Sequence, residues 1–342
     1  MSLGVAVVGC GAIAHVHVPA ILASPGVELL GVYDRDATRA QNVSKEFGVE
    51  RIFGSWAEVL SDPAVDVVDL LLPHDLHRDY AVEALAAGKH AVVEKPLATT
   101  LEEIDHMRSA AAQAGRYLLP CHTRLYESRT ERMTELLAQG AIGEVYMVQS
   151  LGLEPPSIVG VRPWLGSGHG GGGVLMAQSV HIAYLMRHFA GEVAEVSAFR
   201  GERKVVQMVD EDSAVVILRF AAGQVGEMLA TFGQTVGPHG HAIVLYGTEG
   251  YLSYGLKWVE ERHVPELFAV SPKLYGDRGL HLVEMPEETR YHAFEGMWTD
   301  FAAAIAEGRM PRVTDLDGRK AVEIVLAAYR SADEDRPVRL PL

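Results

Sequence analysis

Residues 3–14 read LGVAVVGCGAIA, and this short stretch decides the fold of the first part of the chain. Positions 5–8 are an unbroken apolar run, a glycine-rich turn follows, and residues 13–22 repeat apolar side chains at helical spacing. A second apolar run, at 27–33, comes next and is followed by Asp34. Strands that are apolar throughout, without alternation, are buried on both faces, which is typical of a parallel sheet covered by helices. The stretch therefore predicts a strand–turn–helix–strand unit in a parallel sheet.

The same alternation continues to about residue 122. Further apolar runs predict strands at 65–72, 90–93 and 116–120. Helical spacing predicts helices at 38–47, 76–87 and 101–114. An alternating series of strands and helices is typical of a doubly wound α/β domain. We therefore expect residues 1–122 to form an N-terminal Rossmann domain with a parallel sheet.

The pattern changes after residue 123, where strands follow one another with only short turns between several of them. The predicted strands are at 145–151, 193–199, 213–220, 224–231, 242–246 and 251–254. The predicted helices are at 131–139, 178–189, 294–307 and 316–332. Consecutive strands joined by tight turns pair antiparallel. Residues 123–342 are therefore expected to form an α+β domain with a mostly antiparallel open sheet, within a chain of the α/β class.

The composition of the chain excludes several classes of protein. Of its 342 residues, 48% are hydrophobic, and 30 basic against 45 acidic residues give a net charge of −15. A chain this acidic repels phosphate backbones and anionic lipids, so we expect no nucleic-acid and no membrane partner. Two cysteines, Cys10 and Cys121, are too few for a disulfide framework. The N-terminus does not read as a signal peptide, and no apolar run reaches the roughly 20 residues of a spanning helix, so we expect a cytoplasmic protein.

The turn after the first strand matches the dinucleotide-binding pattern GxGxxG/A. Gly9 permits the tight turn, and Gly11 lets a pyrophosphate approach backbone N–H groups. The helix that follows begins with a partial positive charge, which favours the same anion. Ala14 is small enough for helix and strand to pack closely. The candidate cofactor-binding residues of this turn are Gly9, Gly11, Ala12 and Ile13.

Asp34 is placed to discriminate between NAD and NADP. It follows the second strand, where a carboxylate accepts hydrogen bonds from the ribose hydroxyls. A carboxylate also repels a 2′-phosphate, which favours NAD. Arg35 and Arg39 are close by and would bind that phosphate if Asp34 turned away, so NADP is the second choice. The other interpretation of Asp34 is a turn acid that only caps the next helix.

Two further loops follow strands at the carboxyl edge of the predicted sheet, where ligands of doubly wound folds bind. The first contains Pro73, His74 and His77, which we expect to border the cofactor, although His77 has the alternative role of capping the next helix. The second contains Glu94 and Lys95 in the motif EKP. The charge of Lys95 can stabilise an alkoxide or polarise a carbonyl. Lys95 is therefore a candidate catalytic residue, with a surface pair to Glu94 as the alternative.

These motifs resemble those of the family of glucose–fructose oxidoreductase, inositol dehydrogenase and rhizopine-catabolism proteins (Gfo/Idh/MocA). The resemblance covers nearly the whole chain. It continues in the segments GAIG at 140–143, GGGVL at 171–175, YGTEG at 246–250, 313–332, and RPV at 336–338. It implies a two-domain NAD(P)-dependent oxidoreductase that forms homodimers or homotetramers through the open sheet. It also implies a sugar, a polyol or a related cyclic alcohol as substrate.

The resemblance further implies that His181, in the helix after the glycine-rich loop, is the general acid–base residue. A neutral imidazole can accept the hydroxyl proton while hydride leaves the carbon. Near His181 the chain departs from the family pattern, because Ala177 and Tyr184 stand where many members have aspartates. Ala177 lies one helical turn before His181, so the usual carboxylate neighbour is missing. The resemblance still implies an oxidoreductase, because Lys95 and His181 are both present.

Four residues outside these motifs are candidate substrate contacts. Arg124 matches a family position that borders both nicotinamide and substrate, so it is also a cofactor candidate. Arg162 and Trp164 precede the glycine-rich loop, where substrate-binding residues often lie. His239 and His241 face the same side of a strand. Without a third ligand we predict no metal there, and His241 is the candidate substrate contact.

Together these features predict an NAD(P)-dependent dehydrogenase that transfers hydride between nicotinamide and a hydroxyl-bearing carbon, with NAD as the cofactor. The predicted cofactor-binding residues are Gly9, Gly11, Ala12, Ile13, Asp34, Arg35, Pro73, His74, His77, Glu94, Lys95 and Arg124. The predicted substrate-binding residues are Lys95, Arg124, Arg162, Trp164, His181 and His241. A cyclic carboxylated diol is an alternative substrate, since arginines also suit a carboxylate. A non-catalytic NAD(P)-binding sensor of the same fold is the alternative function, suggested by Ala177.

Overall fold

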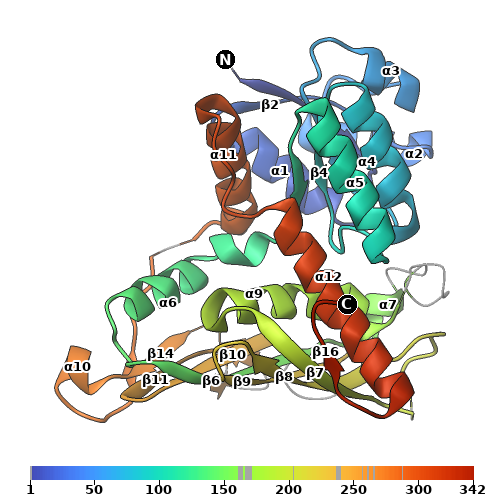
Figure 1. The fold of residues 1–342 in the computed structure, drawn as a ribbon. Helices are drawn as coiled ribbons and strands as arrows, with labels where there is room; N and C mark the ends of the chain where they lie inside the picture. The colour runs from blue at the N-terminus through green and yellow to red at the C-terminus, as the bar shows by residue number, and fades with distance from the viewer. Residues whose placement is uncertain are drawn as a thin grey trace. The chain divides into compact units, whose positions relative to one another are not determined.

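The computed structural model describes residues 2–160, 165, 172–202, 204–235, 240–255, 257–259, 262–264, 266–286 and 288–342. The chain divides into two compact units, which are described one at a time (Figure 1). The first unit consists of Met1–Tyr126 and Glu288–Arg319, and the second of Glu127–Glu287 and Lys320–Leu342. The first unit thus includes a late segment of the chain, while a domain boundary at residue 122 stays a prediction.

The first unit contains a five-stranded parallel sheet in the order β2-β1-β3-β4-β5. Its strands are β1 (Leu3–Val8), β2 (Val27–Tyr33), β3 (Val67–Leu70), β4 (His90–Val93) and β5 (Leu118–Pro120). Every residue of β3, β4 and β5 is buried, as expected for strands covered on both faces. The strand order reverses between β1 and β3, which is the switch point where doubly wound sheets bind ligands. The predicted Rossmann sheet is confirmed.

Helices from both ends of the chain pack in the first unit. They are α1 (Ala14–Ala23), α2 (Ala37–Phe47), α3 (Trp56–Ser61), α4 (His77–Ala86), α5 (Leu101–Ala114) and α11 (His292–Glu307), with the 3₁₀ turns η1 (His74–Leu76) and η2 (Thr123–Tyr126). Helix α4 packs beside α5 (Figure 1), and α11 packs against α1 and η2. The side chains of Trp298 and Phe301 in α11 are fully buried. The C-terminal half of the chain therefore contributes to the core of the Rossmann unit.

The second unit contains a nine-stranded sheet in the order β15-β14-β11-β10-β6-β9-β8-β7-β16. Its strands are β6 (Val145–Leu153), β7 (Val193–Arg200), β8 (Ser213–Phe220), β9 (Val225–Thr231), β10 (Gly240–Gly247), β11 (Gly250–Tyr254), β14 (Leu267–Val270), β15 (His281–Leu282) and β16 (Val338–Arg339). Neighbouring strands are antiparallel except β6 and β9, which are parallel. The strands β12 (Lys257–Val259) and β13 (Arg262–Val264) form a separate hairpin. The predicted mostly antiparallel sheet is confirmed.

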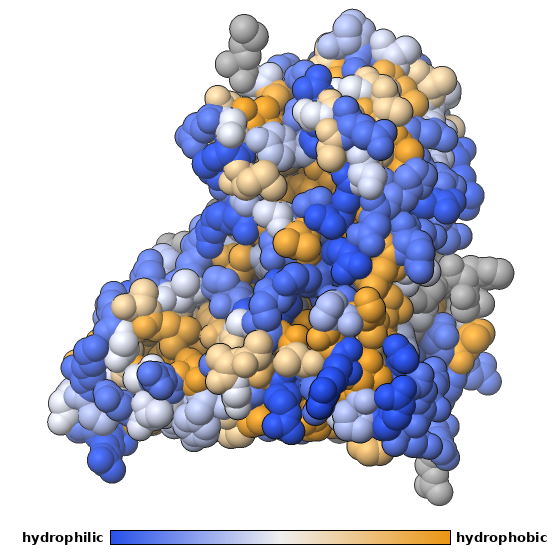
Figure 2. Space-filling view, in the orientation of Figure 1, coloured by the Kyte–Doolittle hydropathy of each residue, from blue (hydrophilic) through white to orange (hydrophobic). Residues whose placement is uncertain are grey.

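The helices of the second unit leave one face of its sheet with exposed apolar side chains. These helices are α6 (Ser128–Ala138), α7 (Ser157–Gly160), α9 (Val180–Ala190), α10 (Pro272–Tyr275) and most of α12 (Asp315–Glu334). The π-helical turn η3 (Leu175–Ser179) leads into α9. Helix α9 packs on β6 and β9. Strand register places Phe199, Ile217 and Val225 on the opposite face, with 70%, 46% and 43% exposure. Figure 2 shows apolar residues in orange on the visible surface of this unit.

No helix in the described part of the chain has both the length and the apolar character needed to cross a lipid bilayer. Helix α12, the longest, has two acidic residues, Asp315 and Asp317, in its first turn.

Candidate active site

The glycine turn after β1 has the shape that a dinucleotide requires. Gly9 has a φ of +105°, and a Cβ there would lie 2.3 Å from the carbonyl oxygen of Leu71. Only glycine permits this backbone conformation and this close approach to the segment after β3. A Cβ at Gly11 would meet no atom within 4 Å, so the turn faces open space there. The turn therefore leaves room for a pyrophosphate to approach the backbone.

Helix α1 begins directly after this turn. Ile13 precedes the helix without a side-chain cap, and the first turn of the helix contains no acidic residue. Ala14 is fully buried and Ala12 is exposed, so the helix start packs closely on the sheet while the turn stays accessible. An uncapped N-terminus and the helix dipole both favour an anion at this position. These residues fit the pyrophosphate of a dinucleotide.

Asp34 faces the same turn from the end of β2. Its Oδ2 accepts a hydrogen bond of 2.7 Å from the N–H of Cys10, and its Oδ1 accepts one of 2.8 Å from the N–H of Asp36. The residue that caps α2 is Asp36, whose side chain accepts from the N–H of Thr38. Arg39 pairs with Asp36 at 3.6 Å. The carboxylate of Asp34 therefore lies at the position where Rossmann folds bind the adenosine ribose of NAD.

His77 connects two loops at the carboxyl edge of the first sheet. Its ring is fully buried, with Nδ1 2.8 Å from the carbonyl oxygen of Pro96 and Nε2 2.9 Å from that of Leu72. Burial lowers the pKa of His77 despite these carbonyls, so a neutral ring donates through one nitrogen at a time. The ring of His74 packs edge-on against it, 5.7 Å away between centroids. His77 therefore fixes the Pro73 loop relative to the turn after β4.

The Glu-Lys-Pro turn contacts a buried cluster of ionisable side chains. Oε2 of Glu94 accepts a hydrogen bond of 3.1 Å from the N–H of Lys95, and Oε1 of Glu94 lies 3.1 Å from Nε2 of His17. Nδ1 of His17 lies 2.9 Å from Oδ2 of Asp69, and both side chains are completely buried. The sequence predictions include neither His17 nor Asp69. An acidic residue inside the apolar run 65–72 is the signal that points to them, because a buried carboxylate requires a partner.

Cys121 and Arg124 follow β5 in the same unit. Burial raises the pKa of the Cys121 thiol well above its ordinary value, and Glu94 and Asp69 add to the shift. The ligating atoms of His17, Asp69 and Cys121 lie within 4.8 Å of one another. Since His17 and Asp69 already share a hydrogen bond and the thiol is protonated, we interpret this group as a hydrogen-bonded cluster. The absence of a metal stays a prediction.

In the second unit, His181 lies on α9 two residues after the π-helical turn η3. Short π-helical segments are frequent at functional sites. The N–H of Ala177 donates to the carbonyl oxygen of Gly173 at 3.0 Å. The side chains of Ala177 and Tyr184 are buried. The segment therefore presents His181 from a locally irregular helix rather than from a uniform one.

Glu211 and Tyr329 hold the start of this helical segment. Oε1 of Glu211 accepts hydrogen bonds from the N–H of Leu175 at 3.0 Å and from the hydroxyl of Tyr329 at 2.9 Å. The same hydroxyl accepts a bond of 3.1 Å from the N–H of Gly173. Burial raises the pKa of the Glu211 carboxyl. Glu211 and Tyr329 thus fix the backbone that leads to His181.

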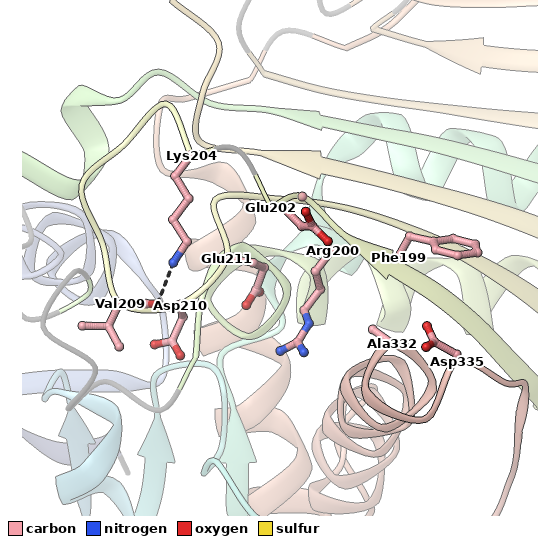
Figure 3. Close-up of a pocket in the computed structure, with 10 residues that line it drawn as sticks. Phe199, Arg200, Glu202, Lys204, Val209, Asp210, Glu211, Ala332 and Asp335 are labelled. Atoms are coloured by element: carbon pink, nitrogen blue, oxygen red, sulfur yellow. Dashed lines mark hydrogen bonds between the residues drawn. The ribbon is translucent and has the colours of Figure 1, made fainter.

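A surface cavity of about 400 Å³ lies beside Glu211 (Figure 3). It is lined by Phe199, Arg200, Gly201, Glu202, Lys204, Val209, Asp210, Glu211, Ala332 and Asp335. Its two cations are engaged within the unit. Arg200 pairs with Asp333, and Nζ of Lys204 donates to the carbonyl oxygen of Val209 at 2.6 Å, as Figure 3 shows. The cavity contains none of the predicted site residues, and its excess of acidic groups does not suit an anionic ligand.

Glu154, Gln178 and His241 form a partly exposed polar cluster in the second unit. Nε2 of Gln178 lies 3.2 Å from Oε1 of Glu154 and 3.2 Å from Nε2 of His241. Nε2 of His241 lies 3.1 Å from the same carboxylate oxygen. The cluster forms because Gly152 in β6 pairs with His241 in β10, and Gln178 packs over this glycine. Gln178 precedes His181 by three residues, so this cluster lies close to the predicted base along the helix.

The structure distributes the predicted site residues over the two units. All the predicted cofactor-binding residues belong to the first unit, as does Lys95, whereas His181 and His241 belong to the second. Arg162, Trp164 and His239 lie outside the described residues. The contacts that sequence reasoning did not anticipate, those of His17, Asp69, Glu154, Gln178, Glu211 and Tyr329, all join residues far apart along the chain.

Two family models match most of the chain. One is described as "Oxidoreductase family, NAD-binding Rossmann fold" and matches residues 3–122; the other is described as "Oxidoreductase family, C-terminal alpha/beta domain" and matches residues 134–340. The scyllo-inositol 2-dehydrogenase (NAD(+)) of Bacillus subtilis is 28% identical, over 98% of this chain and 95% of that protein. The myo-inositol 2-dehydrogenase of Thermotoga maritima is 26% identical, over 98% of both chains.

Solved structures show the same fold. Levoglucosan dehydrogenase in complex with NADH and levoglucosan matches with a TM-score of 0.90 and 23% identity, over 100% of both chains. An oxidoreductase from Agrobacterium radiobacter in complex with NAD⁺, L-tartaric acid and magnesium matches with a TM-score of 0.88 and 22% identity, over 99% of this chain and 98% of that one.

Proposed function

The chain belongs to the Gfo/Idh/MocA oxidoreductase family, and on this basis we propose that it is an NAD-dependent dehydrogenase acting on a hydroxyl group of a sugar, a polyol or a cyclic diol. The observation that carries the proposal is the orientation of Asp34, whose carboxylate accepts a hydrogen bond from the glycine turn. Two inositol dehydrogenases that match nearly the whole chain support a hydroxylated substrate. They favour an enzyme over a non-catalytic sensor.

The first unit offers a set of groups that fits NAD. The proposed contacts of the pyrophosphate and adenosine are Gly9, Gly11, Ala12, Ile13, Asp34 and Arg35. The proposed contacts of the nicotinamide end are Pro73, His74, His77, Glu94, Lys95 and Arg124. When bound, NAD supplies the hydride acceptor for the oxidation of an alcohol. The protein supplies binding, orientation and proton transfer.

Lys95 and His181 are the proposed catalytic residues. The ammonium of Lys95 stabilises the negative charge that develops on the substrate oxygen as the hydroxyl proton leaves. The imidazole of His181 accepts that proton. In the reverse direction Lys95 polarises the carbonyl and His181 returns the proton. The other proposed substrate contacts are Arg124, Arg162, Trp164 and His241.

The Glu154 cluster favours a neutral substrate over a carboxylated diol. The side chain of Glu154 is 22% exposed and that of His241 is 13% exposed, so both are partly accessible. A carboxylate, an amide and an imidazole together accept and donate the hydrogen bonds of neighbouring hydroxyl groups. The negative charge of Glu154 would repel a substrate carboxylate. We therefore propose neutral polyhydroxylated compounds as the preferred substrates.

A substrate screen tests this function. We expect NAD⁺ reduction, followed by the absorbance of reduced nicotinamide, with neutral polyols, aldoses or cyclic diols and weaker activity with their carboxylated analogues. Glu154→Gln is expected to raise KM for the neutral substrate about tenfold, because a hydrogen bond to a charged group contributes about 1.5–3 kcal/mol. Glu144→Gln is the matched control, because Glu144 is an exposed glutamate in the same unit. A wild-type preference for carboxylated substrates would contradict the assignment of Glu154.

Cofactor selectivity is expected to depend on Asp34. Calorimetric titration should show tighter binding of NAD than of NADP, because the carboxylate accepts from the ribose and repels a 2′-phosphate. Asp34→Ala should weaken NAD binding by about tenfold and remove the discrimination against NADP. Asp34→Asn keeps an acceptor without the charge and separates the two effects. Tighter binding of NADP by the wild type would mean that Arg35 and Arg39 dominate.

We also propose that the protein is a homodimer or homotetramer assembled through the sheet face opposite α9. Phe199, Ile217 and Val225 are exposed on this face, and contiguous exposed apolar surface is typical of protein interfaces. The cytoplasmic location stays a prediction.

A further inference from the structure

His17 lies between two carboxylates, each within hydrogen-bonding distance of one ring nitrogen. Nδ1 lies 2.9 Å from Oδ2 of Asp69, and Nε2 lies 3.1 Å from Oε1 of Glu94. The side chains of His17 and Asp69 are completely buried and that of Glu94 is 13% exposed. Three elements contribute to this arrangement: α1, β3 and the turn after β4. The cluster therefore links the helix of the dinucleotide turn to the turn that contains Lys95.

The two contacts are both hydrogen bonds only when the cluster holds an additional proton. A hydrogen bond between an imidazole nitrogen and a carboxylate oxygen requires one proton, and ionised carboxylates bring none. A neutral histidine has a single N–H and satisfies only one of the two contacts. To satisfy both contacts, the cluster holds one proton more than a neutral imidazole with two ionised carboxylates.

Electrostatics places the additional proton on His17. Burial by itself would lower the pKa of His17, but Asp69 and Glu94 outweigh burial and raise the pKa to about 10. Burial, together with the charge of Glu94, raises the pKa of Asp69, although the charge of His17 and its hydrogen bond act in the opposite direction. An imidazolium between two carboxylates satisfies both contacts and pairs the buried charge of Asp69.

The other groups that act on this cluster include Cys121, Phe294 and Lys95. Burial and the two carboxylates raise the pKa of the Cys121 thiol well above its ordinary value, so Cys121 brings no further negative charge. From α11, the ring of Phe294 packs edge-on against His17, 4.8 Å away between centroids. Lys95 follows Glu94 directly, and its charge lowers the pKa of Cys121, whereas the two carboxylates raise it.

We propose that His17, as a doubly protonated imidazolium between Asp69 and Glu94, is a positioning residue that fixes the Glu94 carboxylate and through it the backbone of Lys95. Both oxygens of Glu94 are engaged, one by His17 and the other by the N–H of Lys95. His77 holds the next part of the turn through the carbonyl oxygen of Pro96. The kinetic consequence rests on the proposed dehydrogenase activity, whereas the protonation state of His17 does not.

The protonation state is measured directly by NMR of the full-length protein with ¹⁵N-labelled histidine. We expect both ring nitrogens of His17 to be protonated at pH 8, with signals assigned by their loss in His17→Gln. A single ring proton at pH 8 would overturn the proposal. A stoichiometric metal ion in the purified protein, found by elemental analysis, would also overturn it, because a metal on a ring nitrogen displaces its proton.

Two variants separate positioning from simple stability. His17→Gln should lower kcat by about 10- to 100-fold, because a small displacement of a catalytic group has an effect of this size, while KM changes less than threefold. The double variant His17→Gln/Asp69→Asn removes one charge of each sign and keeps a chain of hydrogen bonds to Glu94, so it should recover most of the lost kcat. His15→Gln is the matched control, since His15 lies on α1 and pairs with Glu46 at the surface, 3.1 Å away. Equal kcat in His17→Gln and wild type would contradict the positioning role.

The pH dependence of stability gives a readout without substrate. Because folding raises the pKa of His17 from 6.5 to about 10, its stabilisation is complete below the ordinary value and is lost as the pH rises through about 10. The urea midpoint of the wild type and of His15→Gln should therefore fall more between pH 7 and 10 than that of His17→Gln/Asp69→Asn. Parallel curves would overturn the charged state of His17. If the wild type oxidises no compound, the proposed function fails, and NMR and unfolding still decide the protonation of His17.

Discussion

Lys95→Ala is expected to lower kcat/KM by a factor on the order of 10²–10³, with NAD affinity nearly unchanged. Loss of one electrostatic group that stabilises a developing oxyanion raises the activation barrier by about 3–4 kcal/mol. The backbone of Lys95 is held by Glu94, so its side chain can be removed without releasing the turn. Steady-state rates with the identified substrate and calorimetry with NAD measure the two quantities separately.

The matched control for this prediction is Lys45→Ala, because Lys45 is an exposed lysine of α2 in the same unit. This control should keep the wild-type rate and the wild-type NAD affinity. Turnover by Lys95→Ala at the wild-type rate would show that the assignment of Lys95 as a catalytic residue is wrong. A large loss of NAD affinity with unchanged kcat would make Lys95 a cofactor-binding residue only.

The elements of the first unit were largely predictable because their signals are local. The predicted bounds 27–33, 90–93 and 101–114 agree with β2, β4 and α5. Thr100 caps the start of α5 with a bond to the N–H of Glu103, and Gly115 ends it with a φ of +62°. Strand β3 is shorter than the predicted run, because Leu71 already belongs to the segment that packs on Gly9.

Elements without a sequence pattern were not predictable. The strands β15 and β16 have two residues each, and β14 has four. Such short strands are defined by pairing with a neighbour and do not contain enough residues to show a period. The parallel pairing of β6 with β9 inside an otherwise antiparallel sheet was not predictable either, because it depends on the order of the strands in space.

The candidate site likewise contains residues that local sequence signals predict and residues that only the fold brings together. Asp34 was predictable because a motif with fixed spacing places a carboxylate after the second strand. Asp69 and Glu94 are 52 and 77 positions from His17, and no local pattern joins residues so far apart. Glu154 meets His241 because of the register between β6 and β10. Pairings of this kind arise from the fold and become visible only when the strands are placed in three dimensions.

The π-helical turn before α9 changes the interpretation of the missing carboxylate. The sequence predicts a regular helix from residue 178, whereas residues 175–179 form a π-helical turn. In the structure, Gln178 from this turn donates to Glu154 at 3.2 Å. The segment that leads to His181 is therefore connected to a carboxylate from β6, although position 177 is alanine.

His181→Gln is expected to lower kcat by about 10²–10⁴, because a positioned general base contributes a factor of this size. The wild-type rate of alcohol oxidation should fall at low pH as the imidazole becomes protonated and can no longer accept the hydroxyl proton. In His181→Gln this acidic limb of the pH–rate profile should disappear, and the remaining rate should rise with hydroxide concentration. Glutamine keeps hydrogen-bonding groups but cannot accept the proton, so substrate KM should change little.

His188→Gln is the matched control, because His188 lies on the same helix and its Nε2 contacts Oγ1 of Thr134 at 2.9 Å. Its pH–rate profile should keep the wild-type acidic limb. An acidic limb that persists unchanged in His181→Gln would mean that another group accepts the proton. Glu154 would then be the first residue to test, because Gln178 connects it to this helix and its side chain is partly exposed, whereas Tyr184 is 3% exposed. Glu154→Gln measured over the same pH range would separate these roles, since a binding carboxylate changes KM and a base changes the limb.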